Sequence, residues 1–348
     1  MKKKYLHSLN WFRGLAIAFV VLGHTDKGFT AESTLGTFIY AFILNGSAFF
    51  VFISGYLFWH LSPAFAYPKY LKTKANNVLF PYLLILTITL ISIIGLSSAG
   101  IHSSDFSNFE YVVELSRPLQ ENGIIWHYLI GGAINYPLWF IPMIIIFFIV
   151  SPAIKHAANQ PYFLAIILIS LLYTLFSKRG DIAPLQFLHY LSIYLLGIFC
   201  KQHENTLYQH AGTLLAITLP LSLIATYLKM HSVGGSFSIV IYGEAFFFNP
   251  ISPPQIITTL SALALLMFIE KQSIKPPILD ILAKYAFGIF FIHFYFLVVT
   301  AAVFNHLGYD NTAIKFIADY FFAITGSVIV CHYTKKFFPK TSRQLLGI

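Results

Sequence analysis

The chain has 348 residues, of which 57% are hydrophobic and only 10% are charged. Soluble domains usually carry about 25% charged residues, so this chain has too little polar surface for a soluble protein, and we predict an all-α polytopic integral membrane protein. The net charge of +9 does not indicate a nucleic-acid partner, because the basic residues cluster at the ends of apolar runs, which is the orientation signal of membrane proteins.

Long apolar runs recur along the whole chain. A spanning helix needs about 20 mainly apolar residues, and about ten such runs predict one transmembrane helical bundle over residues 1–348, with no appended soluble domain. The predicted spans are 9–27, 36–59, 78–98, 136–154, 162–177, 183–200, 211–229, 252–270, 280–304 and 313–333. Two further apolar stretches, 122–134 and 236–248, are predicted to be interfacial or re-entrant.

The charges orient this predicted bundle. Most of the 22 lysines and arginines fall on one side if the N-terminus is inside, so both termini are predicted to be cytoplasmic. The basic start is followed by an apolar run without a small-residue cleavage site, which favours an uncleaved first span. Cys200 and Cys331 lie near predicted cytoplasmic helix ends, where thiols stay reduced, and no Cys/His metal spacing is present.

The first predicted span contains two ionisable residues. Arg13 and His24 are eleven residues apart, which is three helical turns plus about 20°, so both lie on one face, about 16 Å apart along the axis. Ionisable residues inside spans are costly and by default indicate function. The alternatives are an Arg13 side chain that only reaches the inner headgroups and a His24 ring satisfied by loop backbone.

The chemistry of this pair favours acyl transfer. Histidine is the usual general base near neutral pH, and arginine binds phosphate through its planar guanidinium group. A basic inner mouth suits a phosphorylated donor that arrives from the cytoplasm, and an imidazole suits a hydroxyl that must be activated. This combination points to a coenzyme A thioester as the donor and a hydroxyl as the acceptor.

The longest predicted outer loop spans residues 99–135. Loops of this length in a compact protein are usually functional or disordered. Glu110 and Glu114 are one helical turn apart within it. They form either a solvated helix face or an acceptor-binding or lid element, and we retain both as candidate substrate-binding residues.

Four strings along the chain carry a resemblance to a known family. They are RGLAIAFVVLGH at 13–24, FFVFISGYLF at 49–58, LWFIPMIIIFFIVSP at 138–152 and AKYAFGIFFIHF at 283–294. In this order and spacing, over essentially the whole chain, they resemble the membrane proteins of acyltransferase family 3.

The resemblance implies an acyl-CoA-dependent O-acyltransferase of the bacterial inner membrane that acetylates sugars of surface or exported glycans, similar to enzymes acting on enterobacterial common antigen and O-antigen. It implies that Arg13 and His24 are the paired essential residues of catalysis, that His24 is the reacting one, and that Arg13 holds the acetyl-CoA donor or shapes its path, with no metal. The implied partners are the lipid bilayer, the donor and a glycan or lipid-linked sugar. Relatives with a soluble esterase-like domain pass the acyl group to it, so a separate periplasmic acyltransferase is a further candidate partner.

The stretch YLKTKANNVLFPY, residues 70–82, departs from the family pattern. Relatives usually carry arginines here, whereas this chain has Lys72 and Lys74. Lysine binds phosphate as a point charge without the bidentate guanidinium geometry. The two lysines are therefore predicted either to bind the donor's pyrophosphate or to act as solvated anchors of the helix end.

Three further residues are candidates with two interpretations each. Trp139 either stacks on the donor or anchors a helix at the interface. Ser54, beside Gly55, either contacts the acceptor or belongs to a small-residue site for close helix approach. His293 either forms a second polar wall of the passage, binding the acceptor, or is a hydrogen-bonded core histidine.

A different class of function is compatible with the same architecture. A polar interior and a basic inner mouth also suit a transporter of a glycan or lipid intermediate that transfers no acyl group. Transporters built from repeats show broken helices at matching positions in two halves, and this sequence lacks that pattern. Consumption of a CoA thioester would distinguish the enzyme from the transporter.

Overall fold

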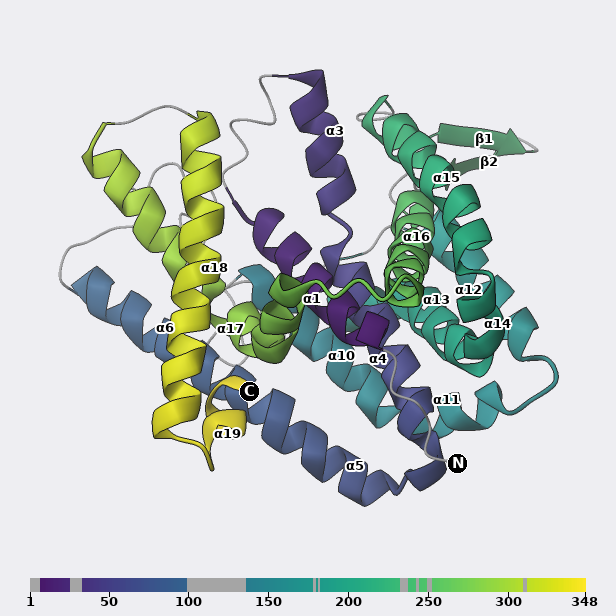
Figure 1. The fold of residues 1–348 in the computed structure, drawn as a ribbon, viewed down its shortest axis with the longest axis horizontal. Helices are drawn as coiled ribbons and strands as arrows, with labels where there is room; N and C mark the ends of the chain where they lie inside the picture. The colour runs from purple at the N-terminus through teal and green to yellow at the C-terminus, as the bar shows by residue number, and fades with distance from the viewer. Residues whose placement is uncertain are drawn as a thin grey trace.

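The computed structural model describes most of the chain, and Figure 1 shows its arrangement. The described residues are 7–25, 33–98, 136–177, 180, 182–231, 237–241, 244–248, 252–308 and 312–348. They form a helical bundle of the all-α membrane type. The described residues at the C-terminal end lie in the lower half of the view (Figure 1).

The helices of the first half are short or interrupted. They are α1 (His7–Leu22), α3 (Thr34–Ile43), α4 (Gly46–Leu61), the 3-10 turn η1 (Ser62–Ala64), α5 (Tyr67–Lys74), the π-helix η2 (Ala75–Leu79), α6 (Phe80–Ser98), the 3-10 turn η4 (Tyr136–Trp139), α10 (Phe140–Ile149), α11 (Ser151–Ala158) and α12 (Phe163–Phe176).

The second half contains the longest helices and one hairpin. The elements are α13 (Ala183–Gln202), α14 (Glu204–Gln209), α15 (Ala211–His231), β1 (Phe237–Ile241), β2 (Glu244–Phe248), α16 (Ser252–Lys271), α17 (Pro277–His306), α18 (Thr312–Phe337) and α19 (Ser342–Leu346).

Helix α1 lies in the middle of the bundle. It packs against α4, α16 and α17, while α17 packs on α18, α15 on α16, and α13 on both α4 and α12. In Figure 1, α17 and α18 lie to the left of α1, and α15 and α16 lie to its right. The first predicted span is therefore an interior helix, in agreement with its two ionisable residues.

The predicted spans all have a counterpart among the described helices. Seven helical stretches are long and apolar enough to cross a membrane by length and composition. The three other predicted spans correspond to the shorter apolar helices α1 and α12 and to the pair α10 and α11. The protein is thus a multi-pass membrane protein.

Two predicted span boundaries are wrong. The span 9–27 was expected to be one helix, but α1 ends at Leu22, and the residues after it form a turn in which the His24 amide donates to the carbonyl of Val21 at 3.0 Å. The span 136–154 is broken at Val150, where α10 and α11 meet at 60°. Pro152 lies in the first turn of α11, and a proline favours a new helix start because it has no N–H to donate.

Within the stretch 236–248, predicted to be interfacial or re-entrant, the described residues Phe237–Ile241 and Glu244–Phe248 form two antiparallel strands. Phe237 pairs with Phe248 and Ile241 with Glu244 in the register of β1 and β2. Aromatic and β-branched residues dominate both strands, and these residue types favour strands. The other such stretch, 122–134, lies outside the described residues.

Glycines bring α4 and α13 into direct backbone contact. A methyl group at Gly55 would overlap the carbonyl oxygen of Tyr194, and one at Gly197 would overlap that of Phe52. The two glycines therefore face each other's helices in a reciprocal arrangement, which is the small-residue packing common between membrane helices. This geometry confirms the predicted close helix approach at Ser54–Gly55, and Gly55 is the residue that allows it.

We expect Gly55→Val to destabilise the protein by at least about 1–3 kcal/mol, the usual penalty for overpacking a well-packed interior. Gly212→Ala is the matched control, because a methyl group there would make only ordinary contacts with the Phe268 ring, at 3.5 and 3.6 Å. The midpoint of thermal unfolding in detergent checks this. Equal midpoints for the two variants would contradict the proposed packing.

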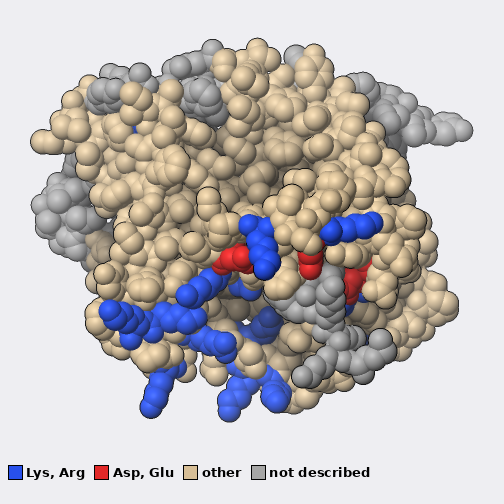
Figure 2. Space-filling view, in the orientation of Figure 1, with Lys and Arg blue, Asp and Glu red and all other residues tan. Residues whose placement is uncertain are grey.

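Positive charge gathers at one end of the bundle. Figure 2 shows Lys and Arg side chains concentrated in the lower half of the visible face, with the upper half almost free of them. The lysine-bearing helix α5 and the end of α18 lie at this lower end (Figure 1). The positive-inside rule predicts that this end faces the cytoplasm.

Candidate active site

The start of α1 is held by two carboxylates from distant parts of the chain. The backbone N–H groups of His7 and Ser8 donate to the two oxygens of Glu270 at 3.1 and 2.9 Å. Asp280 accepts from the Asn10 amide and the Trp11 indole, both at 3.0 Å. The first amides of a helix lack intrahelical acceptors, and negative charge stabilises that end. The helix end that carries Arg13 is therefore fixed to α16 and α17.

Gly14 fixes the same end by close packing. A methyl group at Gly14 would overlap the carbonyl of Leu279, in the first turn of α17. The backbones of α1 and α17 thus touch directly beside Arg13. The Arg-Gly sequence therefore combines a cation with the small residue that seats its helix.

Arg13 and Lys74 bring two positive charges together at this end. Lys74 ends α5 and is half-buried, close enough to Arg13 for the two charges to repel each other. Its ammonium lies 4.7 Å from the centre of the Phe148 ring and 5.3 Å from that of Tyr70. Lys72, by contrast, is exposed. The structure thus shows that Lys74 and Lys72 differ in burial, a difference that the sequence did not reveal.

The π-helix η2 directly follows Lys74 and is in contact with residues near the C-terminal end of the chain. Gly347 has φ +70° and lies against the carbonyl of Asn77 in η2. The Ser342 hydroxyl donates to the Ile348 carbonyl at 2.8 Å and closes this segment into a compact unit. Single π-turns occur frequently at functional sites, and this one begins directly after Lys74.

A buried tyrosine lies at the same end of the bundle. Tyr56 is 2% exposed, and its hydroxyl has no hydrogen-bond partner among the described residues. The Lys201 ammonium, which pairs with Glu204, lies 5.4 Å from the centre of the Tyr56 ring. Buried polar atoms are rarely left unpaired, so this hydroxyl is available to a ligand. Sequence analysis did not select Tyr56, although it follows Ser54–Gly55 directly.

At the other end of α1, His24 faces a second histidine. Its ring lies 5.5 Å from that of His293, centroid to centroid, with the planes 31° apart. His24 is half-buried, whereas His293 is completely buried. The turn after Leu22 brings this about, because it directs His24 off the helix axis toward α17. The structure therefore brings together two histidines that are far apart in the sequence.

Hydrogen-bond geometry assigns the tautomer of His293. Its Nδ1 lies 2.9 and 3.0 Å from the carbonyl oxygens of Ile289 and Phe290, so Nδ1 carries the hydrogen and donates. Its Nε2 is then an acceptor, and it has no partner among the described residues. A neutral imidazole with a free buried lone pair next to His24 suits a hydrogen bond from a bound hydroxyl.

Helix α10 connects the two ends of the site. Phe148 lies under Lys74, while Phe140 packs on Phe290 at 5.8 Å, and Phe290 lies 6.5 Å from His293. Phe140 and Phe148 are eight positions apart in α10, which corresponds to about 12 Å along the axis. Both α1 and α10 therefore reach from the cationic end to the histidine end.

Trp139 and Ser54 are more restricted than their predicted binding roles require. Trp139 is buried and stacks on Tyr190 at 5.9 Å, which covers one face of its indole. The Ser54 hydroxyl donates to the Phe50 carbonyl of its own helix at 2.8 Å. Donor binding by Trp139 and acceptor binding by Ser54 remain predictions. Glu110 and Glu114 lie outside the described residues.

Comparison with known proteins identifies the family. A protein-family model described as an acyltransferase domain matches residues 6–334, which is nearly the whole chain. The chain belongs to acyltransferase family 3. It is therefore a membrane acyltransferase that transfers groups other than aminoacyl groups. Searches of curated proteins and of solved structures found no match.

The matched region of this acyltransferase contains every described residue of the site. Arg13, Lys74, His24 and His293 all lie within it. In the parts of the chain that the structure describes, no group of three or more His, Cys, Asp or Glu is placed to hold a metal ion. The described site residues supply imidazole, ammonium, guanidinium and phenol groups.

Proposed function

We propose that this acyltransferase moves an acyl group, with acetyl as the preferred group, from acyl-CoA to a sugar hydroxyl of a cell-surface or exported polysaccharide. The observation that carries the proposal is the arrangement of α1, with a cation pair at one end and a histidine pair at the other. A donor with phosphates at one end and a reactive thioester at the other matches this arrangement.

The cationic end suits the phosphates of coenzyme A. Like charges held side by side repel each other, and a bound polyanion relieves that repulsion. Arg13 supplies a planar fork of donors and Lys74 supplies a point charge. The Tyr56 hydroxyl, which has no partner among the described residues, supplies a further donor. Charge-assisted hydrogen bonds of this kind are roughly twice as strong as neutral ones.

The separation of the two ends suits the rest of the donor. Arg13 lies nine residues, or about 14 Å along the axis, from Leu22 at the end of α1, and His24 lies in the turn just beyond it, so the separation is comparable to the extended pantetheine arm of coenzyme A. With the pyrophosphate at Arg13 and Lys74, the arm would lie along α1 and α10 and present the thioester near His24. A water-soluble donor that enters at the cationic end would thus reach an acceptor at the opposite side of the membrane.

His24 is proposed as the general base or as a transient carrier of the acyl group. As a base, its ring takes the proton of the sugar hydroxyl while that oxygen attacks the thioester carbonyl. The carbon–sulfur bond then breaks, and the proton passes from the imidazole to the departing thiolate. As a carrier, its nitrogen would attack the thioester carbonyl, the carbon–sulfur bond would break, and the departing thiolate would take the ring proton. In a second step the sugar oxygen would displace the imidazole, which takes up the hydroxyl proton.

The proposed setting is the bacterial inner membrane, with donor entering from the cytoplasm. The acceptor is a glycan or a lipid-linked sugar, and a separate periplasmic acyltransferase is a further proposed partner. Support comes from the gathering of lysines and arginines at one end of the bundle (Figure 2), which the positive-inside rule assigns to the cytoplasm.

Transfer of label from acetyl-CoA tests the proposal directly. Purified protein in proteoliposomes is incubated with radiolabelled acetyl-CoA and an extracted glycan fraction. We expect label to reach the glycan with equivalent release of free coenzyme A. Movement of glycan across the membrane without consumption of the thioester would contradict the proposal and favour a transporter.

We expect His293→Phe to lower kcat about 10- to 100-fold, because the Nε2 of His293 would accept from a second hydroxyl of the sugar and so hold the reacting hydroxyl at His24, and leaving a buried polar group without its partner costs about 1–3 kcal/mol. The KM for acetyl-CoA should stay nearly unchanged, since His293 lies at the end away from Arg13. His293→Gln, whose amide reaches the Nε2 position, should recover part of the rate. A change in the KM for acetyl-CoA with no change in kcat would contradict this role, because it would place His293 at donor binding.

A further inference from the structure

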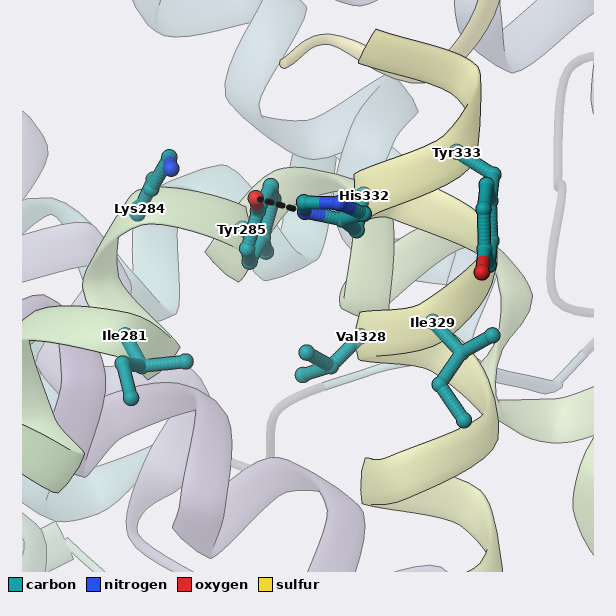
Figure 3. Close-up of a pocket in the computed structure, with 7 residues that line it drawn as sticks. All are labelled: Ile281, Lys284, Tyr285, Val328, Ile329, His332 and Tyr333. Carbon is teal, nitrogen blue, oxygen red and sulfur yellow. Dashed lines mark hydrogen bonds between the residues drawn. The ribbon is translucent and has the colours of Figure 1, made fainter. Parts of the chain in front are cut away.

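A pocket lies between α17 and α18, outside the site described above (Figure 3). Its volume is about 420 Å³, within the range of small-ligand sites. The lining residues are Ile281, Lys284, Tyr285, Val328, Ile329, His332 and Tyr333. None of them belongs to the proposed acyl-transfer machinery.

The pocket has a polar side and an apolar side. Figure 3 shows Lys284, Tyr285 and His332 along one side and the aliphatic side chains of Ile281, Val328 and Ile329 along the other. The Tyr285 hydroxyl and the Nδ1 of His332 form a hydrogen bond of 3.4 Å. The Lys284 ammonium lies 5.0 Å from the centre of the Tyr285 ring. A ligand that fits must be amphiphilic.

The charges around the polar side are positive. On α18, His332 is one turn closer to the lysine pair Lys335–Lys336 than Val328 is, so the polar side faces the basic end of the bundle. Lys284 and His332 are both exposed. Asp280, one turn before Lys284, is engaged by Asn10 and Trp11 of α1. The surroundings are therefore complementary to a negatively charged group.

The exposure of the apolar side distinguishes a lipid from a soluble anion. Ile281 and Ile329 are each 50% exposed, which is unfavourable in water and natural beside acyl chains. The volume is too small for a whole phospholipid but suits its glycerol phosphate and the first part of one chain. Basic pockets between spanning helices on the cytoplasmic side are known to bind anionic headgroups.

We propose that this pocket binds one anionic phospholipid of the inner leaflet. The phosphate lies against Lys284 and His332, and the upper part of an acyl chain packs on Ile281, Val328 and Ile329. The lipid bridges α17, which carries His293, and α18. This inference does not depend on the identity of the acyl donor or acceptor.

Native mass spectrometry of the full chain, released from nanodiscs that contain equal phosphatidylglycerol and phosphatidylcholine, tests the proposal. We expect one phosphatidylglycerol to be retained preferentially. Lys284→Gln should weaken its retention about fivefold, since a lysine near an anionic headgroup contributes about 1 kcal/mol. The matched control is Lys275→Gln, which removes an exposed lysine outside the pocket and should change nothing.

A second variant addresses the apolar side. Val328→Trp fills the cavity and should abolish preferential retention, with the thermal midpoint measured to show that the bundle is intact. Lys284 is exposed, so its substitution remains informative if the tryptophan variant does not fold. The proposal would be overturned by equal retention of both lipids by the wild type or by equal effects of Lys284→Gln and Lys275→Gln. It would also be overturned if a second copy of the chain occupied the pocket.

Discussion

His24→Ala should lower acyl transfer by about 10²–10⁴-fold, the usual contribution of a positioned general acid–base group. The protein should remain folded, because the ring is half-buried at the end of α1 and not part of the packed core. Initial rates of label transfer from acetyl-CoA in proteoliposomes measure the effect. Donor binding should persist, since the cationic end of the site is untouched.

His306→Ala is the matched control for this substitution. His306 ends α17, the same helix that carries His293, and its side chain is exposed. We expect it to leave the rate within about threefold of wild type, as surface substitutions usually do. Wild-type rates in purified His24→Ala protein would remove His24 from the mechanism.

The two roles proposed for His24 can be separated with the same preparation. A carrier forms an acyl-imidazole, so brief incubation with labelled acetyl-CoA without acceptor should leave label on the peptide that contains residue 24. A general base leaves none there. Either outcome retains His24 in the reaction and selects the order of the steps.

Lys74→Ala should raise the KM for acetyl-CoA about 10- to 100-fold, whereas Lys72→Ala should leave it nearly unchanged. Losing a hydrogen bond to a charged group costs about 1.5–3 kcal/mol, and only Lys74 is directed inward, over the Phe148 ring and beside Arg13. Initial rates over a range of acetyl-CoA concentrations give the comparison. Both lysines lie in α5, so differences in helix stability largely cancel.

Lys74→Arg refines this test. Arginine keeps the charge and adds the planar fork that matches phosphate geometry, so donor affinity should be kept or improved. Equal KM values for Lys72→Ala and Lys74→Ala would show that α5 only anchors the helix end. A fall in kcat without change in KM for Lys74→Ala would place the lysine at the reaction instead.

The helical bundle and the Arg13–His24 pair could be predicted from the sequence because both depend on local patterns. Apolar runs of spanning length identify the helices, and two ionisable residues within one run are conspicuous. The end of α1 at Leu22 was not predicted because the run stays apolar up to Gly23, although a glycine directly after the last helical residue is a common helix stop.

Other features of the site depend on distant parts of the chain. The pairing of His24 with His293 and the anchoring of α1 by Glu270 arise from helices that meet only in the folded bundle. The different orientations of Lys72 and Lys74 follow from the position of α5 and from the π-turn after it. Periodicity alone shows that two residues of a helix lie on different faces. It does not show which of the two faces is buried in the bundle.

The anchoring of α1 also has a consequence for how the protein is made. The amides of His7 and Ser8 leave the ribosome first, yet their acceptor, Glu270, is synthesised after more than three quarters of the chain. Until then the first helix holds Arg13 in the membrane without the neighbours that later enclose it. The earliest inserted segment is therefore among the last to reach its final position in the bundle. Products of interrupted synthesis contain both Arg13 and His24 but no assembled site.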